Sequence, residues 1–135
     1  MIYLDTSALV KLTRAEPASD DLAGWLGERR SAALVASALV EVELPRALRR
    51  HAPEALGQVP AVLASLYLLD VDALVRSAAA GYPDPRLRSL DAIHLATAQL
   101  AASGDEPLEA FVAYDDRLLV AARGLGISVA SPGRA

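Results

Sequence analysis

The chain has 135 residues, a normal size for one compact domain with its own core, and we expect a single domain over residues 1–135. It contains no cysteine, which excludes disulfides, thiolate metal sites and cysteine nucleophiles. A net charge of −4 and an aromatic content of 4% argue against a protein that coats nucleic acid or stacks bases. They leave room for a nuclease, because metal-binding carboxylates make the charge more negative and bound cations reverse it locally.

The apolar segments of the chain do not indicate a membrane protein. The amino-terminal residues lack the basic start and the apolar stretch of a signal peptide. The longest apolar run, near residues 59–69, is too short to cross a bilayer. We therefore expect a cytoplasmic protein without a membrane partner.

Short apolar runs, separated by segments with helical spacing, predict the strands. Continuous apolar runs of this kind are typical of parallel strands that are buried on both faces. Strands that alternate with helices favour an α/β fold with a central parallel sheet and helices on both of its faces. The predicted strands are Ile2–Leu4, Ala33–Val35, Leu66–Val71, Phe111–Tyr114 and Ile127–Ala130.

Capping residues mark two helices in the first half of the chain. Ser19-Asp20 is a suitable cap for a helix that carries its apolar residues on one side. Ser37 is the expected cap of the next helix, which should run through Leu44. Pro45 then interrupts this helix, either as a kink or as the first residue of a new turn.

Three more helices are predicted in the second half, with a loop between the first two. The clearest loop is residues 81–85, where two prolines and a glycine break regular structure. The expected helices begin at Asp72 and end at Gly81, follow Ser89 over residues 90–103, and follow Asp115-Asp116 over residues 117–123.

Four acidic residues fall at positions that a parallel sheet would bring to one edge. Asp5 and Asp115 come directly after predicted strands, Asp91 lies in the first turn of a helix, and Glu43 lies in the helix after the second strand. Ligands of open α/β sheets bind outside the carboxyl ends of the strands. Carboxylate oxygens are the ligands that Mg²⁺ and Mn²⁺ prefer, and such cations activate water and neutralise phosphodiester charge.

Each of these acids also has an ordinary structural explanation. Asp5 and Asp115 are suitable helix caps, Asp91 is favoured by the helix dipole, and Glu43 fits a solvated helix face. The structural explanation is preferred for each residue alone, whereas a shared site is preferred for the four together. Without a cation, carboxylates gathered this closely repel one another, and the pKa of at least one should rise.

With these motifs in place, the sequence resembles the PIN-domain family, and within it the VapC-type toxins of bacterial toxin–antitoxin pairs. The resemblance covers nearly the whole chain, and the order of its motifs is specific although each motif alone is weak. The matching stretches are IYLDTSAL at residues 2–9, VEL at 42–44 with RAL at 46–48, LDAIHLATA at 90–98, YDDRL at 114–118, Gly126, and Pro132-Gly133.

The resemblance implies a three-layer α/β/α fold and RNA cleavage that depends on Mg²⁺ or Mn²⁺. It implies that the metal is held by Asp5, Glu43, Asp91 and Asp115. It further implies a homodimer that is inhibited by a cognate antitoxin, whose tail reaches into the active site. Glu41 remains an alternative to Glu43.

Asp116 stays an alternative to Asp115, or serves as a cap or outer ligand. The Ser7 hydroxyl either holds a metal-bound water or substrate phosphate, or caps a helix. His94, one turn beyond Asp91, is expected to be a buried structural residue rather than a general base. Arg86 and Arg88 precede Asp91 on a predicted loop and are the candidates for binding RNA phosphates.

Other functions fit the residues less well. A haloacid-dehalogenase-like phosphatase needs a second aspartate two residues after the first, where this chain has Ser7. A receiver-like domain needs a lysine after a late strand, but the only lysine is Lys11. A catalytically weak PIN-like module for RNA binding or regulation is the remaining alternative, and the presence of all four acids argues against it.

Overall fold

A computed structural model of the chain describes residues 1–134 and contains one five-stranded parallel sheet. Ala135, the last residue of the expected domain, lies outside the described residues. The strand order is β3-β2-β1-β4-β5. The strands are β1 (Ile2–Leu4), β2 (Leu34–Ser37), β3 (Tyr67–Leu69), β4 (Ala110–Val112) and β5 (Val129–Ala130).

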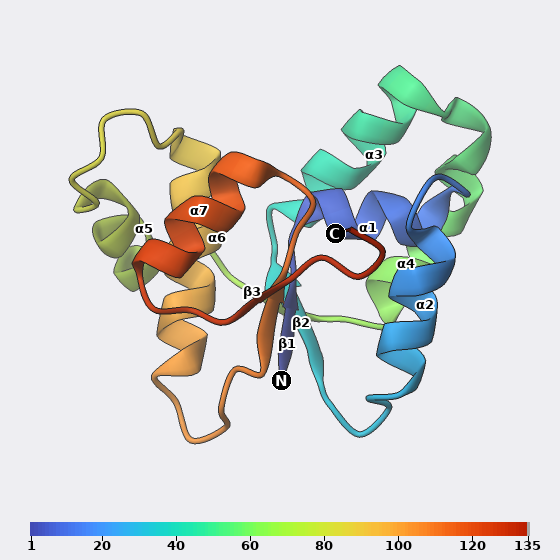
Figure 1. Cartoon of the computed structure of the whole chain (residues 1–135). Helices are drawn as coiled ribbons and strands as arrows, with labels where there is room; N and C mark the ends of the chain where they lie inside the picture. Colours follow the sequence, from blue (N-terminus) through green and yellow to red (C-terminus); the bar gives the residue numbers. More distant parts are fainter. Residues whose placement is uncertain (135) are drawn as a thin grey trace.

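Helices cover both faces of the sheet, so the predicted three-layer α/β/α arrangement is confirmed (Figure 1). One face carries α1 (Thr6–Thr13), α2 (Ser19–Gly27), α3 (Val40–His51), the 3-10 helix η1 (Pro53–Gln58) and α4 (Val59–Ala64). The other carries α5 (Ala73–Ala80), α6 (Ser89–Ala102) and α7 (Asp116–Gly124). In residues 1–134, no helix has the length and apolar character needed to span a membrane.

The core lies in two layers because alternate residues of each strand point to opposite faces. In β1, Ile2 and Leu4 pack against the α1–α4 side, and Tyr3 packs against the α5–α7 side. All three side chains are completely buried. Tyr3 stacks on Phe111 of β4 with the ring centroids 5.0 Å apart. The continuous apolar runs of the sequence thus reflect strands buried on both faces.

The order of the strands in the sheet reverses between β1 and β4, and this leaves a crevice at the carboxyl ends of these two strands. From β1 the chain moves outward to β2 and β3, and it then returns to pair β4 with the other edge of β1. Such a switch point, at the carboxyl ends of the strands, is the usual ligand site of an open α/β sheet. Asp5 stands there, its N–H donating to the carbonyl of Val112 at 3.0 Å.

The five predicted strands are confirmed in number and in their sequence along the chain, but their limits differ. β2 extends to Ser37 because Ala36 and Ser37 pair with β3, although small residues give little strand signal. β4 ends before Tyr114, whose N–H donates to the Ser7 hydroxyl at 2.9 Å instead of continuing the sheet. The structure also shortens the segments expected at 66–71 and 127–130 to Tyr67–Leu69 and Val129–Ala130.

Two predicted helix caps are wrong. The helix near Ser19 is present, but its cap position is Ala18, and the Ser19 hydroxyl binds the Arg14 carbonyl and the Glu16 N–H. Ser37 ends β2, and its hydroxyl accepts from the Leu39 N–H in the turn before α3. Both serines therefore order the chain ahead of a helix rather than cap it.

Of the two alternatives for Pro45, the first residue of a new turn is wrong, because α3 is continuous through Pro45 and ends at His51. The kink stays a prediction. Because proline has no N–H, the carbonyl of Glu41 lacks its usual helical donor, and the exposed position of Glu41 lets water replace that donor. The 3-10 helix η1 and the short helix α4 were not predicted; each begins with a proline at its first or second position.

Candidate active site

Asp5 occupies the centre of the candidate site and is fixed by Ser7. It caps α1, and its Oδ2 accepts from the Ser7 N–H at 3.1 Å and from the Ser7 hydroxyl at 2.7 Å. The Ser7 oxygen in turn accepts from the N–H of Tyr114. The two alternatives for Asp5, a cap or a site residue, are therefore compatible, because the capping bonds orient the carboxylate at the crevice.

Glu43 faces the same crevice from α3, whereas Glu41 is exposed on that helix. The Oε1 atom of Glu43 accepts from the Thr6 hydroxyl at 2.9 Å and lies 2.6 Å from Nε2 of His94. The structure thus places Glu43, rather than Glu41, with the other acids. Thr6 had no expected part in the site.

His94 is buried and contacts two of the candidate acids. Its Nδ1 lies 2.7 Å from the Tyr3 hydroxyl. Its Nε2 contacts Glu43 and lies 3.7 Å from Oδ1 of Asp5. The sequence correctly indicates a buried, satisfied histidine, but it gives no sign of the bond to Glu43. The one sequence feature that could have indicated a place for His94 in the site is its position a single helical turn after Asp91.

Asp91 and Asp115 complete the group of four. The pKa of Asp91 is raised by partial burial and then by the negative charges of Asp115 and Asp5, which outweigh the opposing effects of Arg88 and His94. Asp115 caps α7 by accepting from the N–H groups of Arg117 and Leu118. Asp116 is 82% exposed and binds Arg134 at 3.1 Å. Asp115, rather than Asp116, is therefore the aspartate whose charge acts on Asp91.

His94 sets the charge state of Glu43. Burial alone would raise the pKa of Glu43, but the hydrogen bond and positive charge of His94, together with the Thr6 bond, lower it. Burial alone would lower the pKa of His94, but the hydrogen bond to Glu43 and the charges of Asp5, Glu43 and Asp91 raise it. The two shifts have opposite directions, as expected for a partly buried pair that favours the ionised forms.

The donor chemistry of the site fits a hard divalent cation. Both bonds from Ser7 reach Oδ2 of Asp5, and the bonds from Thr6 and His94 reach Oε1 of Glu43. One oxygen of each carboxylate is therefore left for a cation. Within residues 1–134, no three acidic or histidine side chains are already spaced as a complete metal cluster. A cation would have to draw the acids together.

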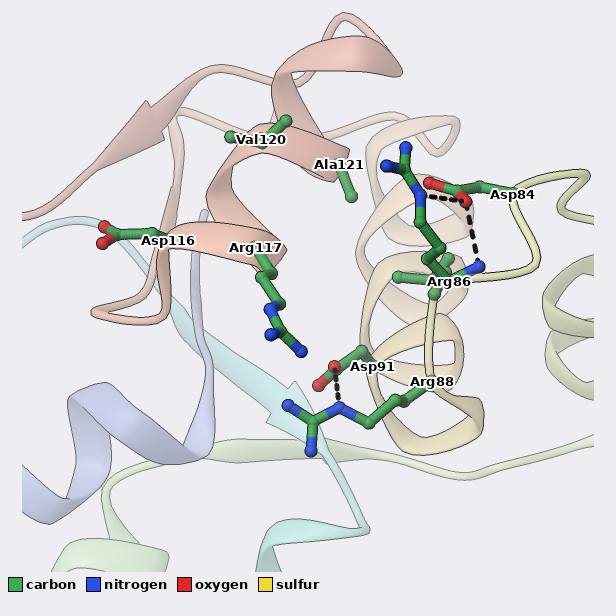
Figure 2. A pocket seen from close by; sticks show the side chains of 9 residues that line it. Asp84, Arg86, Arg88, Asp91, Asp116, Arg117, Val120 and Ala121 are labelled. Atoms are coloured by element: carbon green, nitrogen blue, oxygen red, sulfur yellow. Dashed lines mark hydrogen bonds and ion pairs between the residues drawn. The ribbon is translucent and has the colours of Figure 1, made fainter.

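A groove of about 550 Å³ opens beside Asp91, between α6 and α7 (Figure 2). Arg88 and Arg117 approach Asp91 from two sides in this view, and Nε of Arg88 lies 3.9 Å from Oδ2 of Asp91. Arg86 is 90% exposed and binds Asp84 at the outer end of the groove. Asp116 points away from Asp91. The groove adds Arg117, which the sequence had not singled out, to the two expected arginines.

The raised pKa of Asp91 predicts a change in stability with pH. Because the folded pKa is above the ordinary 3.8, the stability contribution of this group is complete below pH 3.8 and is lost as pH rises through the folded pKa. Asp91→Asn should therefore raise the unfolding free energy of the metal-free protein at neutral pH, and this gain should vanish below pH 3.8. Urea unfolding with a chelator measures both.

The matched control for this stability prediction is Asp116→Asn, because Asp116 is exposed. It should leave the unfolding free energy nearly unchanged at both pH values. A neutral-pH loss of stability in Asp91→Asn would show that the attraction between Asp91 and Arg88 outweighs the repulsion among the acids.

Comparison of the sequence with known proteins shows the family of the chain. Residues 2–124 match the PIN domain model. The chain is 58% identical over 135 residues to Ribonuclease VapC35 of Mycobacterium tuberculosis, covering 100% of this chain and 99% of that protein. The chain therefore belongs to the PIN-domain family, as its sequence motifs predict.

Solved structures agree with the fold. The Mycobacterium tuberculosis toxin VapC20, described as cleaving the sarcin-ricin loop, superposes with a TM-score of 0.70 at 16% identity, covering 90% of this chain and 95% of that one. A chain of a Klebsiella pneumoniae toxin–antitoxin complex gives 0.70 at 18% identity, covering 98% of each chain. At these identities the likeness supports the fold alone.

Proposed function

We propose that the chain is a single-domain endoribonuclease of the toxin–antitoxin kind, and that Asp5, Glu43, Asp91 and Asp115 hold one or two Mg²⁺ or Mn²⁺ ions. The convergence of these carboxylates at the β1–β4 crevice carries the proposal. Nε2 of His94 lies near both Glu43 and Asp5. Burial, and then the charges of Asp115 and Asp5, raise the pKa of Asp91. Full-length identity of 58% to a protein named a ribonuclease supports RNA as the substrate.

Each proposed ligand of the cation is oriented by different contacts. When bound, the cation activates water and neutralises charge on the phosphodiester. Asp5 is oriented by Ser7, Asp115 by the N–H groups that it caps, and Glu43 by Thr6 and His94. Asp91 is half-buried among negative charges, so a cation relieves the repulsion that raises its pKa. Arg88 and Arg117 are proposed to bind phosphates that flank the cleaved bond.

An antitoxin and a second copy of the chain are the proposed protein partners. A solved structure with the same fold is a chain of a toxin–antitoxin complex, and the antitoxin is proposed from that likeness of fold. We propose that the antitoxin tail reaches into the crevice, where the carboxylates would attract a cationic side chain. The homodimer and the cytoplasmic location remain predictions.

The function is tested by incubating the purified chain with single-stranded RNA and Mn²⁺. Attack of water on phosphorus with departure of the 3′ oxygen gives a 5′-phosphate and a 3′-hydroxyl. We expect these ends, no need for the 2′-hydroxyl of the cleaved nucleotide, and complete loss of cleavage with a chelator. Cyclic 2′,3′-phosphate ends would contradict metal-activated water. Binding of Mn²⁺ without cleavage of any RNA would favour the catalytically weak PIN-like module.

A further inference from the structure

A buried chain of hydrogen bonds runs from the backbone of β2 to Glu43. The Ser37 N–H donates to the Tyr3 hydroxyl oxygen at 3.2 Å. That hydroxyl lies 2.7 Å from Nδ1 of His94, and Nε2 of His94 lies 2.6 Å from Oε1 of Glu43. Tyr3, Ser37 and His94 are all at most 1% exposed. Water therefore has little access to replace the bonds among Ser37, Tyr3 and His94.

The direction of the bonds follows from the two ends of the chain of hydrogen bonds, because the Ser37 N–H can only donate and the Glu43 carboxylate can only accept. Nε2 of His94 therefore carries a proton and donates it to Oε1 of Glu43. In the neutral imidazole, Nδ1 is then an acceptor and takes the proton of the Tyr3 hydroxyl. A protonated imidazole donates from Nε2 as well, and its Nδ1–H donates to the Tyr3 oxygen. Glu43 is thus the acceptor in either state of His94.

Glu43 needs such support more than the neighbouring aspartates do. Asp5 and Asp115 have short side chains and accept from backbone N–H groups at the starts of α1 and α7. Glu43 has a longer side chain, and its bonds come from the side chains of Thr6 and His94. Fixing a long carboxylate for a ligand costs conformational entropy unless the protein has already ordered it.

We propose that His94 is a positioning residue for Glu43: together with Thr6 it holds Oε1, and it turns Oε2 toward the cation, while Tyr3 and the Ser37 backbone fix the imidazole ring. The proposal rests on the proposed function, in which Glu43 is a metal ligand. It gives His94 no contact with substrate and no transfer of a proton. It also explains why a histidine is buried beside the acids although a purely structural role needs no bond to Glu43.

The test compares two amides at position 94. His94→Gln can place its amide nitrogen near the former Nε2 and keep the donor to Glu43, whereas His94→Asn is too short to reach that far. We expect calorimetric titration with Mn²⁺ alone to give a dissociation constant near that of the wild type for His94→Gln. We expect an approximately tenfold weaker one for His94→Asn. Equal affinities in the two variants would overturn the proposal.

A second measurement does not involve the metal. Nitrogen NMR of the imidazole in the metal-free protein, above the pKa of His94, should show the proton on Nε2. A proton on Nδ1 would overturn the proposal even if one variant failed to fold. Titration of wild type and Glu43→Gln separates this outcome from failure of the proposed function. If the wild type does not bind Mn²⁺, the metal site itself is contradicted. If the wild type binds Mn²⁺, Glu43→Gln binds it more weakly and the two His94 variants bind it equally well, only the positioning role of His94 is contradicted.

Discussion

Asp5→Asn and Asp91→Asn are each expected to slow RNA cleavage by about a hundred- to a thousandfold. A cation at a phosphodiester supplies several kcal/mol of charge stabilisation, and about 1.4 kcal/mol corresponds to tenfold in rate. Asparagine keeps the shape but not the charge, so the cation is held weakly. Single-turnover cleavage of an RNA that the wild type cuts, at one fixed Mn²⁺ concentration that just saturates the wild type, measures the effect.

The folds of these variants should survive for different reasons. Asparagine caps helices about as well as aspartate, so Asp5→Asn keeps the acceptor for the Ser7 N–H at the start of α1. Asp91→Asn removes a carboxylate whose pKa is raised by burial and by the charges of its acidic neighbours. Unchanged far-ultraviolet circular dichroism with lost cleavage is therefore the expected combination. Cleavage at the wild-type rate in either variant would remove that residue from the proposed mechanism.

Glu43→Gln and Glu41→Gln provide a matched pair on one helix. Glu43 is bound to His94 and Thr6, whereas Glu41 is exposed. We expect Glu43→Gln to lose cleavage and Glu41→Gln to retain it. The opposite result would assign the ligand role to Glu41 and would contradict the placement of α3.

The sequence predicts the site best where local structure determines position. Asp5 follows β1 directly and Asp115 caps the helix that comes after β4, and a parallel sheet places the ends of such strands at one edge whatever the details of packing. Asp91 in the first turn of α6 is equally local, because Ser89 and the loop before it mark the helix start. For these three residues, recognising the elements is enough to predict that they converge.

The rest of the site depends on contacts that no local pattern encodes. His94 and Glu43 are 51 positions apart, and the Tyr3 hydroxyl reaches His94 across 91 positions. Glu43 and Glu41 lie on different sides of α3. The sequence does not show which side faces the site, because Pro45 predicts an interruption where the helix is in fact continuous. Only the packing of α3 and α6 against β1 and β2 decides these contacts.

The same packing explains why the structural and functional interpretations of the acids coincide. A helix start offers free N–H groups, which hold a carboxylate in a fixed place at little entropic cost. Asp5 and Asp115 accept from such N–H groups at the starts of α1 and α7, the helices that follow the adjacent strands β1 and β4. The crevice between these strands brings both carboxylates near Asp91. Capping therefore supplies part of the preorganisation that a cation site requires, rather than competing with it.

The groove beside Asp91 supports a prediction about substrate binding. Arg88 and Arg117 line it. Among residues 1–134, the ionic contact of Arg88 is a long one of 3.9 Å to Asp91, so its guanidinium is available to a phosphate. Each exposed ionic contact is worth up to about 1 kcal/mol, so the double variant Arg88→Ala/Arg117→Ala should bind RNA roughly ten- to thirtyfold more weakly. Fluorescence anisotropy with a chelator present measures binding without cleavage.

Salt dependence distinguishes phosphate contacts from a general change in the protein. Each contact to single-stranded RNA contributes about 0.7 to the slope of log affinity against log salt, so the double variant should have a slope shallower by about 1.4. Arg30→Ala is the control, because Arg30 is exposed in the turn before β2, at the opposite end of the strands. Equal slopes for wild type and double variant would show that the RNA takes another path to Asp91.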